Sequence, residues 1–113
     1  LPSNVVKDMV GIKQEKPLTI AHIQNKVSDY FNISTSDICS KMRTKEVVYA
    51  RQIAMYITRE ITNNSLPKIG EQFGNRDHTT VLHAWDKIKQ LIKTDTETKT
   101  IITVLVDTIK SAD

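Results

Sequence analysis

The most informative segment of this chain is Phe73-Gly-Asn-Arg-Asp-His-Thr-Thr-Val-Leu-His-Ala84. Gly74 predicts a tight turn, because glycine enters the left-handed backbone region without steric cost. Thr79, His83 and Asp86 fall almost opposite the apolar stripe of the helix that follows. The members of that stripe are Val81, Ala84, Trp85, Ile88, Leu91 and Ile92. The stretch predicts a helix with an exposed polar start and a back, Trp85 included, that is anchored in a core.

A second short helix is predicted directly before this turn, over residues 66–73. A glycine on that helix, Gly70, lets the next helix pack closely, and Gly74 permits the turn. Two short helices joined in this way form a helix-turn-helix. The alternative is a plain helical hairpin inside a core. The polar run Arg76-Asp-His-Thr-Thr80 disfavours that alternative, because these side chains are poor core material.

Earlier segments of the chain also read as helical, because the sequence has only three glycines and three prolines. Thr19 predicts the cap of a helix that runs to Phe31. Ser34 and Asp37 resemble a short capping box. The strongest amphipathic pattern spans residues 46–62 and consists of Ala50, Ile53, Ala54, Ile57 and Ile61.

The segment 96–111 has the Thr, Ile and Val content of a strand, but its apolar residues recur at helical spacing. We interpret it as a helix, because a lone strand would have no partner. Residues 40–46 show no apolar period and predict a loop. The predicted fold is therefore an all-α, compact helical domain with a helix-turn-helix and a preceding basic loop.

The composition is that of one globular domain. The chain has 113 residues, of which 39% are hydrophobic and 26% are charged. Its apolar runs fall well short of the roughly 18 residues that a membrane span needs. Cys39 is the only cysteine, which excludes a disulfide framework and favours a reducing compartment.

The sequence predicts neither a metal site nor an enzyme. His78 and His83 lie five residues apart, so one helical face does not hold both, and no third ligand stands at suitable spacing. There is no Gly-x-x-x-x-Gly-Lys-Ser/Thr loop for nucleotide phosphates. Asp77 and His78 suggest hydrolysis only beside a nucleophile, and adjacent residues on a helix are not expected to face each other.

The positive charge is concentrated in one third of the chain. Residues 40–77 contain seven Lys and Arg against four Asp and Glu, which accounts for the whole net charge of +3. Taken alone, this region reads as a solvated basic face. Beside a helix-turn-helix, it favours binding to nucleic-acid phosphates.

The side chains at the start of the helix after Gly74 suit base reading. The Asp77 carboxylate can accept from cytosine, His78 can donate or accept, and the Thr79 methyl can contact a thymine methyl. Asp77 could equally serve as an N-cap. Leu66 and Pro67 lie beside the predicted turn, where they could staple the following helix or contact thymine methyl groups.

Cations around this helix suit phosphates and the minor groove. Lys41, Arg43 and Lys45 alternate, so an extended loop would project them to one side, where they could reach a narrow A·T-rich minor groove. The alternative is a disordered surface loop. Arg76 could bind phosphate or form an ion pair with Glu71. On the helix over residues 46–62, Arg51, Gln52 and Arg59 are expected to lie away from the core stripe.

The run Asn64-Ser-Leu-Pro-Lys-Ile-Gly-Glu-Gln-Phe-Gly-Asn-Arg-Asp-His-Thr-Thr-Val-Leu-His-Ala84 resembles the signature of the DnaA family of bacterial chromosomal replication initiators. The similarity extends back through Ser40-Lys-Met-Arg-Thr-Lys-Glu-Val-Val-Tyr-Ala-Arg-Gln-Ile-Ala-Met55. It covers roughly residues 18–112, and the string is specific to that family.

The resemblance implies an all-helical domain, over residues 18–113, that binds DnaA boxes of the replication origin. Arg43 would then enter the minor groove. The base contacts in the major groove would come from Leu66, Pro67, Asp77, His78 and Thr79. Phosphates would be held by Lys45, Arg51, Gln52, Arg59, Arg76 and Thr80.

The resemblance also implies what lies outside this domain. Residues 1–17 would be the end of a linker helix from a preceding ATPase domain, which would bind ATP and magnesium and hydrolyse ATP. The isolated domain is expected to be a monomer without a cofactor or a membrane span, in the cytoplasm and on the nucleoid. Regulatory proteins are expected to bind the DNA-reading face.

Two departures from the family pattern matter. Asn75 stands where the family usually has a second glycine, and Asn tolerates a left-handed backbone better than most residues. Met42, Glu46 and Tyr49 stand where relatives often carry Arg or small residues. The thinned basic loop predicts weaker and less salt-sensitive binding.

Two other interpretations stay open at this stage. One is a protein-interaction module whose surface at residues 76–83 docks a regulatory partner. The other is a helix-turn-helix transcription regulator, which would bind palindromes as a dimer. The final helix is the only candidate for a dimer contact.

Overall fold

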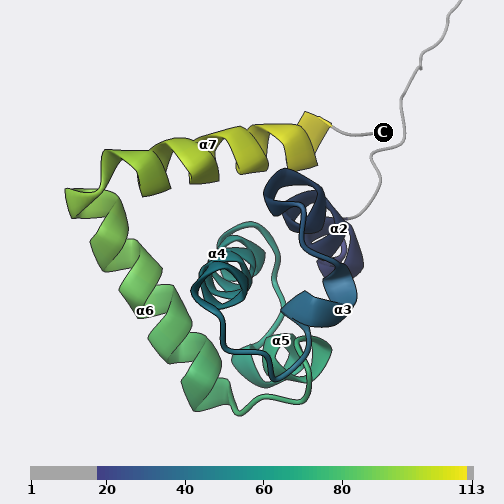
Figure 1. The fold of residues 1–113 in the computed structure, drawn as a ribbon. Helices are drawn as coiled ribbons and strands as arrows, with labels where there is room; N and C mark the ends of the chain where they lie inside the picture. The colour runs from purple at the N-terminus through teal and green to yellow at the C-terminus, as the bar shows by residue number, and fades with distance from the viewer. Residues whose placement is uncertain (1–17, 112–113) are drawn as a thin grey trace, which may run out of the picture.

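The computed structural model describes residues 18–111, and every regular element in this range is a helix (Figure 1). The order is α2 (Ile20–Phe31), α3 (Thr35–Ile38), α4 (Lys45–Ile61), α5 (Leu66–Gln72), α6 (His78–Thr94) and α7 (Thr96–Ser111). The all-α prediction is confirmed, and so is the helical interpretation of residues 96–111. The predicted linker helix at residues 1–17 lies outside the described residues.

Helix α4 forms the centre of the domain, and the other helices surround it (Figure 1). It contacts α2, α3, α5, α6 and α7. Ala50, Ile53, Ala54 and Ile57 are completely buried, as the amphipathic pattern predicts. On α7, the buried residues are Thr98, Ile101, Ile102, Leu105 and Ile109. The core is therefore built around one central helix whose apolar face is covered on several sides.

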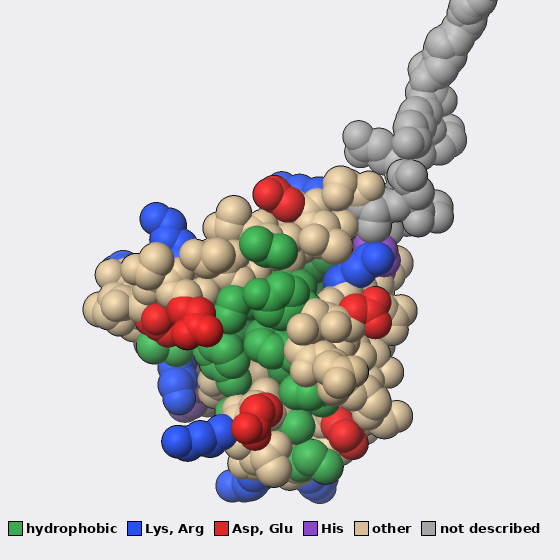
Figure 2. Space-filling model, turned by 45° about the horizontal axis from the view of Figure 1, so that its top comes forward, with side chains coloured by type: hydrophobic (Ala, Val, Ile, Leu, Met, Phe, Trp, Pro, Cys, Tyr) green, Lys and Arg blue, Asp and Glu red, His purple; other side chains and the backbone are tan. Residues whose placement is uncertain are grey.

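Part of the apolar surface stays open to solvent. Phe31, Tyr49 and Leu91 are only partly buried against the core, and the rings of Phe31 and Tyr49 pack edge to face at 5.8 Å. Figure 2 shows one face on which hydrophobic side chains gather, with charged side chains around them. The Tyr49 hydroxyl lies 2.7 Å from the Thr98 hydroxyl, a hydrogen bond that links α4 to α7.

The helices begin in two different ways. The hydroxyls of Thr19, Ser34 and Ser65 accept backbone N–H groups at the starts of α2, α3 and α5, which confirms the predicted caps at Thr19 and Ser34. Thr44 and Asp77 occupy the cap positions of α4 and α6, but their side chains make no capping hydrogen bond. The first-turn N–H groups of α4 and α6 are therefore left without a side-chain acceptor among the described residues.

The predicted loop at residues 40–46 is too long by two residues. Helix α4 begins at Lys45, because Thr44 adopts extended cap angles and its carbonyl accepts the Val48 N–H at 2.9 Å. The basic loop therefore ends at Thr44. Lys45 and Glu46 lie on the first turn of α4 instead of in the loop.

The predicted helix-turn-helix is formed by α5, a tight turn and α6. A Cβ atom on Gly70 would lie 2.1 Å from the Arg76 carbonyl oxygen, so only glycine permits this close approach. Gly74 and Asn75 both have left-handed backbones, with φ of 92° and 57°. The expectation that Asn75 tolerates the turn is confirmed. Phe73 and Val81 are completely buried on the two sides of the turn.

A candidate nucleic-acid interface

A groove runs between the basic loop, α4 and the first half of α6. Its cations come from the loop, from α4, from the turn before α6 and from α6 itself, and none of the Asp and Glu residues within 18–111 lines it. The polar lining residues are Lys41, Arg43, Arg51, Gln52, Asn75, Arg76, Thr80, His83 and Lys87. Such a groove concentrates positive potential and attracts anions.

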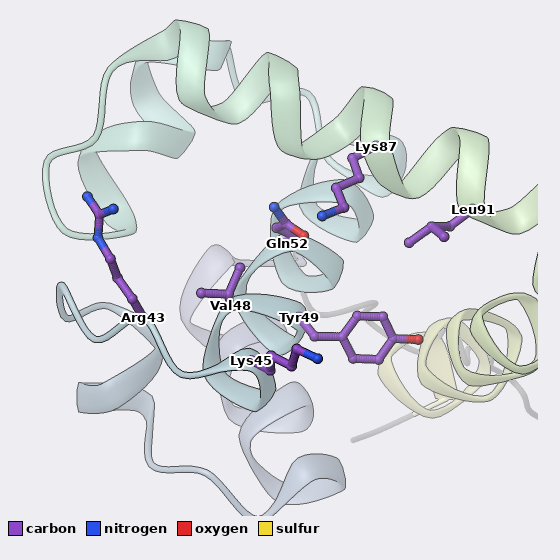
Figure 3. Close-up of a pocket in the computed structure, with 7 residues that line it drawn as sticks. All are labelled: Arg43, Lys45, Val48, Tyr49, Gln52, Lys87 and Leu91. Atoms are coloured by element: carbon purple, nitrogen blue, oxygen red, sulfur yellow. The ribbon is translucent and has the colours of Figure 1, made fainter.

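The groove continues into a second hollow between the start of α4 and the middle of α6. Figure 3 shows Lys87 reaching from α6 toward Gln52 on α4, with Arg43 on the loop at one end. Tyr49 and Leu91 lie at the other end (Figure 3). Since the two hollows share Arg43, Gln52 and Lys87, they form one continuous basic surface.

The start of α6 presents polar side chains to solvent. Asp77, His78, Thr79 and Thr80 are all exposed, as predicted. The expectation that Asp77 and His78 cannot face each other is wrong, because Asp77 precedes the helix with extended angles. Its Oδ1 lies 3.1 Å from His78 Nδ1. This contact uses Nδ1, so Nε2 is the ring nitrogen that is left to face another molecule.

Arg51 differs from its predicted placement. It is 6% exposed instead of lying away from the core stripe. Its Nε donates to the Ile38 carbonyl at 2.7 Å, and its Nη2 lies 2.9 Å from the carbonyls of Ser40 and Met42. Burial, and then the nearby charge of Arg76, lowers the pKa of Arg51 from its ordinary value. The burial of Arg51 could not be predicted from the apolar pattern of α4, because that pattern does not show that the loop folds over Arg51.

Arg76 also turns toward backbone carbonyls. Its Nε donates to the Phe73 carbonyl at 2.9 Å, and its Nη2 donates to the Ser40 carbonyl. The predicted alternative of an ion pair with Glu71 does not form among the described residues; the guanidinium is occupied by the turn and the loop. The predicted phosphate contacts of Arg51 and Arg76 stay predictions.

Arg59 packs against Trp85 on the flank of the α4–α6 contact. The guanidinium carbon lies 4.4 Å from the ring centroid, and Nη1 is buried without a hydrogen-bond partner among the described residues. The Trp85 indole donates to Glu60 at 2.7 Å. The prediction that Trp85 belongs to the core is wrong, since it is only partly buried. Its N–H therefore has a hydrogen-bond acceptor, and that acceptor lies on an exposed residue.

Leu66 and Pro67 separate into two environments. Leu66 is partly buried and packs against the core, which fits the staple interpretation. Pro67 is exposed in the first turn of α5, where its missing N–H costs little. Pro67 is therefore the more accessible of the two for contact with another molecule.

The predicted site residues omit Asn75, His83 and Lys87, all of which line the groove; Lys41, predicted as part of the basic arm, lines it as well. The signal for two of them was in the sequence. Thr80, His83 and Lys87 lie at i, i+3 and i+7, which places them on one face of α6. Asn75 could be placed only once the loop and the turn were known to meet.

The fold and this surface define a helix-turn-helix domain that binds DNA. Residues 20–88 match the family described as "Bacterial dnaA protein helix-turn-helix", and the chain belongs to this family. Within the described range of 18–111, every helix is too short or too polar to cross a membrane.

A solved structure described as "Crystal structure of DNA replication initiation factor" is similar to this chain. The two are 32% identical, with a TM-score of 0.72. The match covers 80% of this chain and 27% of that one, so this chain spans about a quarter of that protein's length.

Proposed function

We propose that this domain binds double-stranded DNA sequence-specifically at DnaA boxes of a replication origin. The start of α6 lies in the major groove, and the loop carrying Arg43 lies in the adjacent minor groove. The observation that carries the proposal is the basic groove without carboxylates, which joins the loop to the exposed polar start of α6. A major groove about 12 Å wide admits one α-helix, and the phosphates beside it match the cations of the groove.

In this arrangement the base contacts come from the first turn of α6. The Asp77 carboxylate accepts from cytosine N4, and His78 presents Nε2 to a base edge. Thr79 offers a hydroxyl and a methyl group, and the exposed Pro67 contacts thymine methyls beside them. Leu66 supports Pro67 from the core side. Arg43 is exposed on the loop, where the negative potential of a narrow minor groove would attract it.

The phosphate contacts come from the walls of the groove. The proposed set contains Lys45, Gln52 and Thr80, and we extend it to His83 and Lys87 because both line the groove. The uncapped N–H groups at the starts of α4 and α6 also suit phosphate oxygens. Arg59 lies outside the lining of the groove and has a buried Nη1, and it stays a predicted phosphate contact. Because the basic loop carries fewer cations than in relatives, we expect its binding to DNA to be weaker and less sensitive to salt.

At the level of the whole protein, we propose a role in the initiation of chromosomal replication, in the cytoplasm and on the nucleoid. ATP and magnesium would be bound, and ATP hydrolysed, by an ATPase domain outside this chain. The domain would bind one box as a monomer. Regulatory proteins would compete for the same basic surface.

Fluorescence anisotropy tests the proposal, with one duplex that carries a DnaA box and one that is scrambled, at two salt concentrations. Tighter binding to the box that survives the higher salt is the expected result. Replacing Lys87 by Gln should weaken binding to both duplexes. It should also reduce the slope of log affinity against log salt concentration by about one. Lys99→Gln, on the exposed side of α7, removes the same charge and should leave both unchanged. Equal, weak binding to both duplexes would refute base reading.

A further inference from the structure

The basic loop and the turn of the helix-turn-helix meet around two arginine side chains. The Arg51 guanidinium lies beneath the loop and donates to the carbonyls of four residues. Those residues are Asp37, Ile38, Ser40 and Met42. One side chain from α4 therefore donates to four backbone carbonyls between the end of α3 and the basic arm.

Arg76 reaches the same loop from the turn before α6. The Ser40 carbonyl accepts from Nη2 of both Arg51 and Arg76, so it joins the two arginines. Arg76 also donates to the Phe73 carbonyl within its own turn. On the other side of the contact, a Cβ atom on Gly74 would lie 2.2 Å from the Cys39 carbonyl oxygen. The backbone of the loop and the backbone of the turn are thus in direct contact.

Placing two arginine side chains so close together costs electrostatic free energy, and the carbonyl hydrogen bonds offset that cost. Two like charges lie near each other, and neither has a carboxylate partner among the described residues. Carbonyl dipoles take the place of the counter-charge, and the planar guanidinium fork fixes their directions as an ammonium could not. Nε and Nη2 of both side chains donate to backbone carbonyls, which leaves Nη1 of each as the main donor for phosphate.

We propose that Arg51 and Arg76 are positioning residues that hold the Arg43 loop and the start of α6 as one preformed reading surface. The consequence for DNA recognition rests on the proposed function. If the two parts form one unit, contact by α6 in the major groove places Arg43 at the minor groove without further ordering. Loosening the loop would then remove the contribution of Arg43 while the α6 contacts remain.

A measurement without DNA tests the structural half of the proposal. In Arg51→Lys, the charge remains but the fork is lost, and backbone ¹⁵N order parameters of residues 41–43 should fall from about 0.85 to below about 0.6. Arg76→Lys, at a partly exposed position, should cause a smaller fall and serves if Arg51→Lys does not fold. Arg59→Lys makes the same chemical change on α4 without touching the loop carbonyls, and should change nothing there. Unchanged order parameters of residues 41–43 in both Arg51→Lys and Arg76→Lys would overturn the proposal.

Affinity for a DnaA-box duplex tests the functional half. Arg51→Lys should weaken binding by about the same factor as Arg43→Ala, roughly tenfold or more. The double variant should lose little beyond either single one. If the two losses multiply, Arg51 acts independently of Arg43 as a phosphate ligand, and the proposal is wrong. If the unaltered domain shows no preference for the box, the proposed function fails, and the order parameters alone decide whether the arginines position the loop.

Discussion

The core and the reading surface of this domain are held together by different forces. Around α4, completely buried aliphatic side chains such as Ile53 and Ile57 supply the contacts. Between the basic loop and the turn before α6, guanidinium–carbonyl hydrogen bonds and the close contact of Gly74 with the Cys39 carbonyl replace them. The core gains stability from apolar area, which is not directional. The reading surface gains a fixed shape from directional bonds, which is what base recognition requires.

The core should respond most strongly to truncation. Ile53→Ala removes a completely buried side chain at the centre of α4 and should lower the free energy of unfolding by about 2–5 kcal/mol. Urea denaturation followed by the fluorescence of Trp85, the single tryptophan, measures this loss. The fraction that remains folded should still prefer the box. A loss well below 1 kcal/mol would mean that α4 is not the centre of the core.

The contact between loop and turn should be the next most sensitive. Gly74→Ala forces a Cβ atom into the Cys39 carbonyl at a φ of 92°, and should cost about 1–3 kcal/mol of stability. Asn75→Gly is the matched control, because glycine accepts the φ of 57° at that position without strain. It should leave the thermal midpoint unchanged or slightly raised. Equal tolerance of both substitutions would contradict the close contact.

The two kinds of helix start offer a finer comparison. Ser65→Ala removes a hydroxyl that accepts the Lys68 N–H at 3.3 Å and should cost about 1 kcal/mol. Thr44→Ala, at the uncapped start of α4, should cost only a few tenths. Thermal unfolding of the two variants side by side measures the difference. A larger loss for Thr44→Ala would show that its side chain caps α4 in solution.

The smallest effect concerns Cys39, below the reading surface. Burial raises the pKa of its thiol above the ordinary value of 9.0, against the lowering effect of Arg51 and Arg76. The unfolded chain therefore ionises first as pH rises. The stability contributed by the neutral thiol is complete below that ordinary value and is lost as pH rises through the folded pKa. Unfolding free energies measured from pH 8 to pH 10 should fall slightly more for this chain than for Cys39→Ser. An identical pH dependence in the two proteins would show that the Cys39 thiol makes no such contribution.

Much of the fold could be predicted because apolar spacing reports directly on burial. The stripes on α4 and α6 identified Ile53, Ile57, Val81 and Ile88 as core residues. Two glycines four residues apart identified the turn. The start of α4 was less predictable, since Thr44 is an extended cap residue without a side-chain capping bond.

The site was harder to predict because tertiary contacts determine which of its side chains are buried and which stay accessible. Arg51 reads as a surface cation in the pattern of α4, and only the position of the loop carbonyls makes it a buried donor. Trp85 reads as core, but its indole N–H draws it toward Glu60 at the surface. Lys87 was detectable from its helical spacing to Thr80, yet its role depends on the groove that α4 forms opposite it.

Methylation interference on a DnaA-box duplex would show whether the start of α6 and the Arg43 loop occupy adjacent major and minor grooves. Dimethyl sulfate modifies guanine N7 in the major groove and adenine N3 in the minor groove, so one experiment reports on both. We expect interference from guanine N7 positions under the start of α6 and from adenine N3 positions under the Arg43 loop, in adjacent parts of the box. Interference at neither kind of position, with binding retained, would show that the domain holds only the phosphates and would contradict the account.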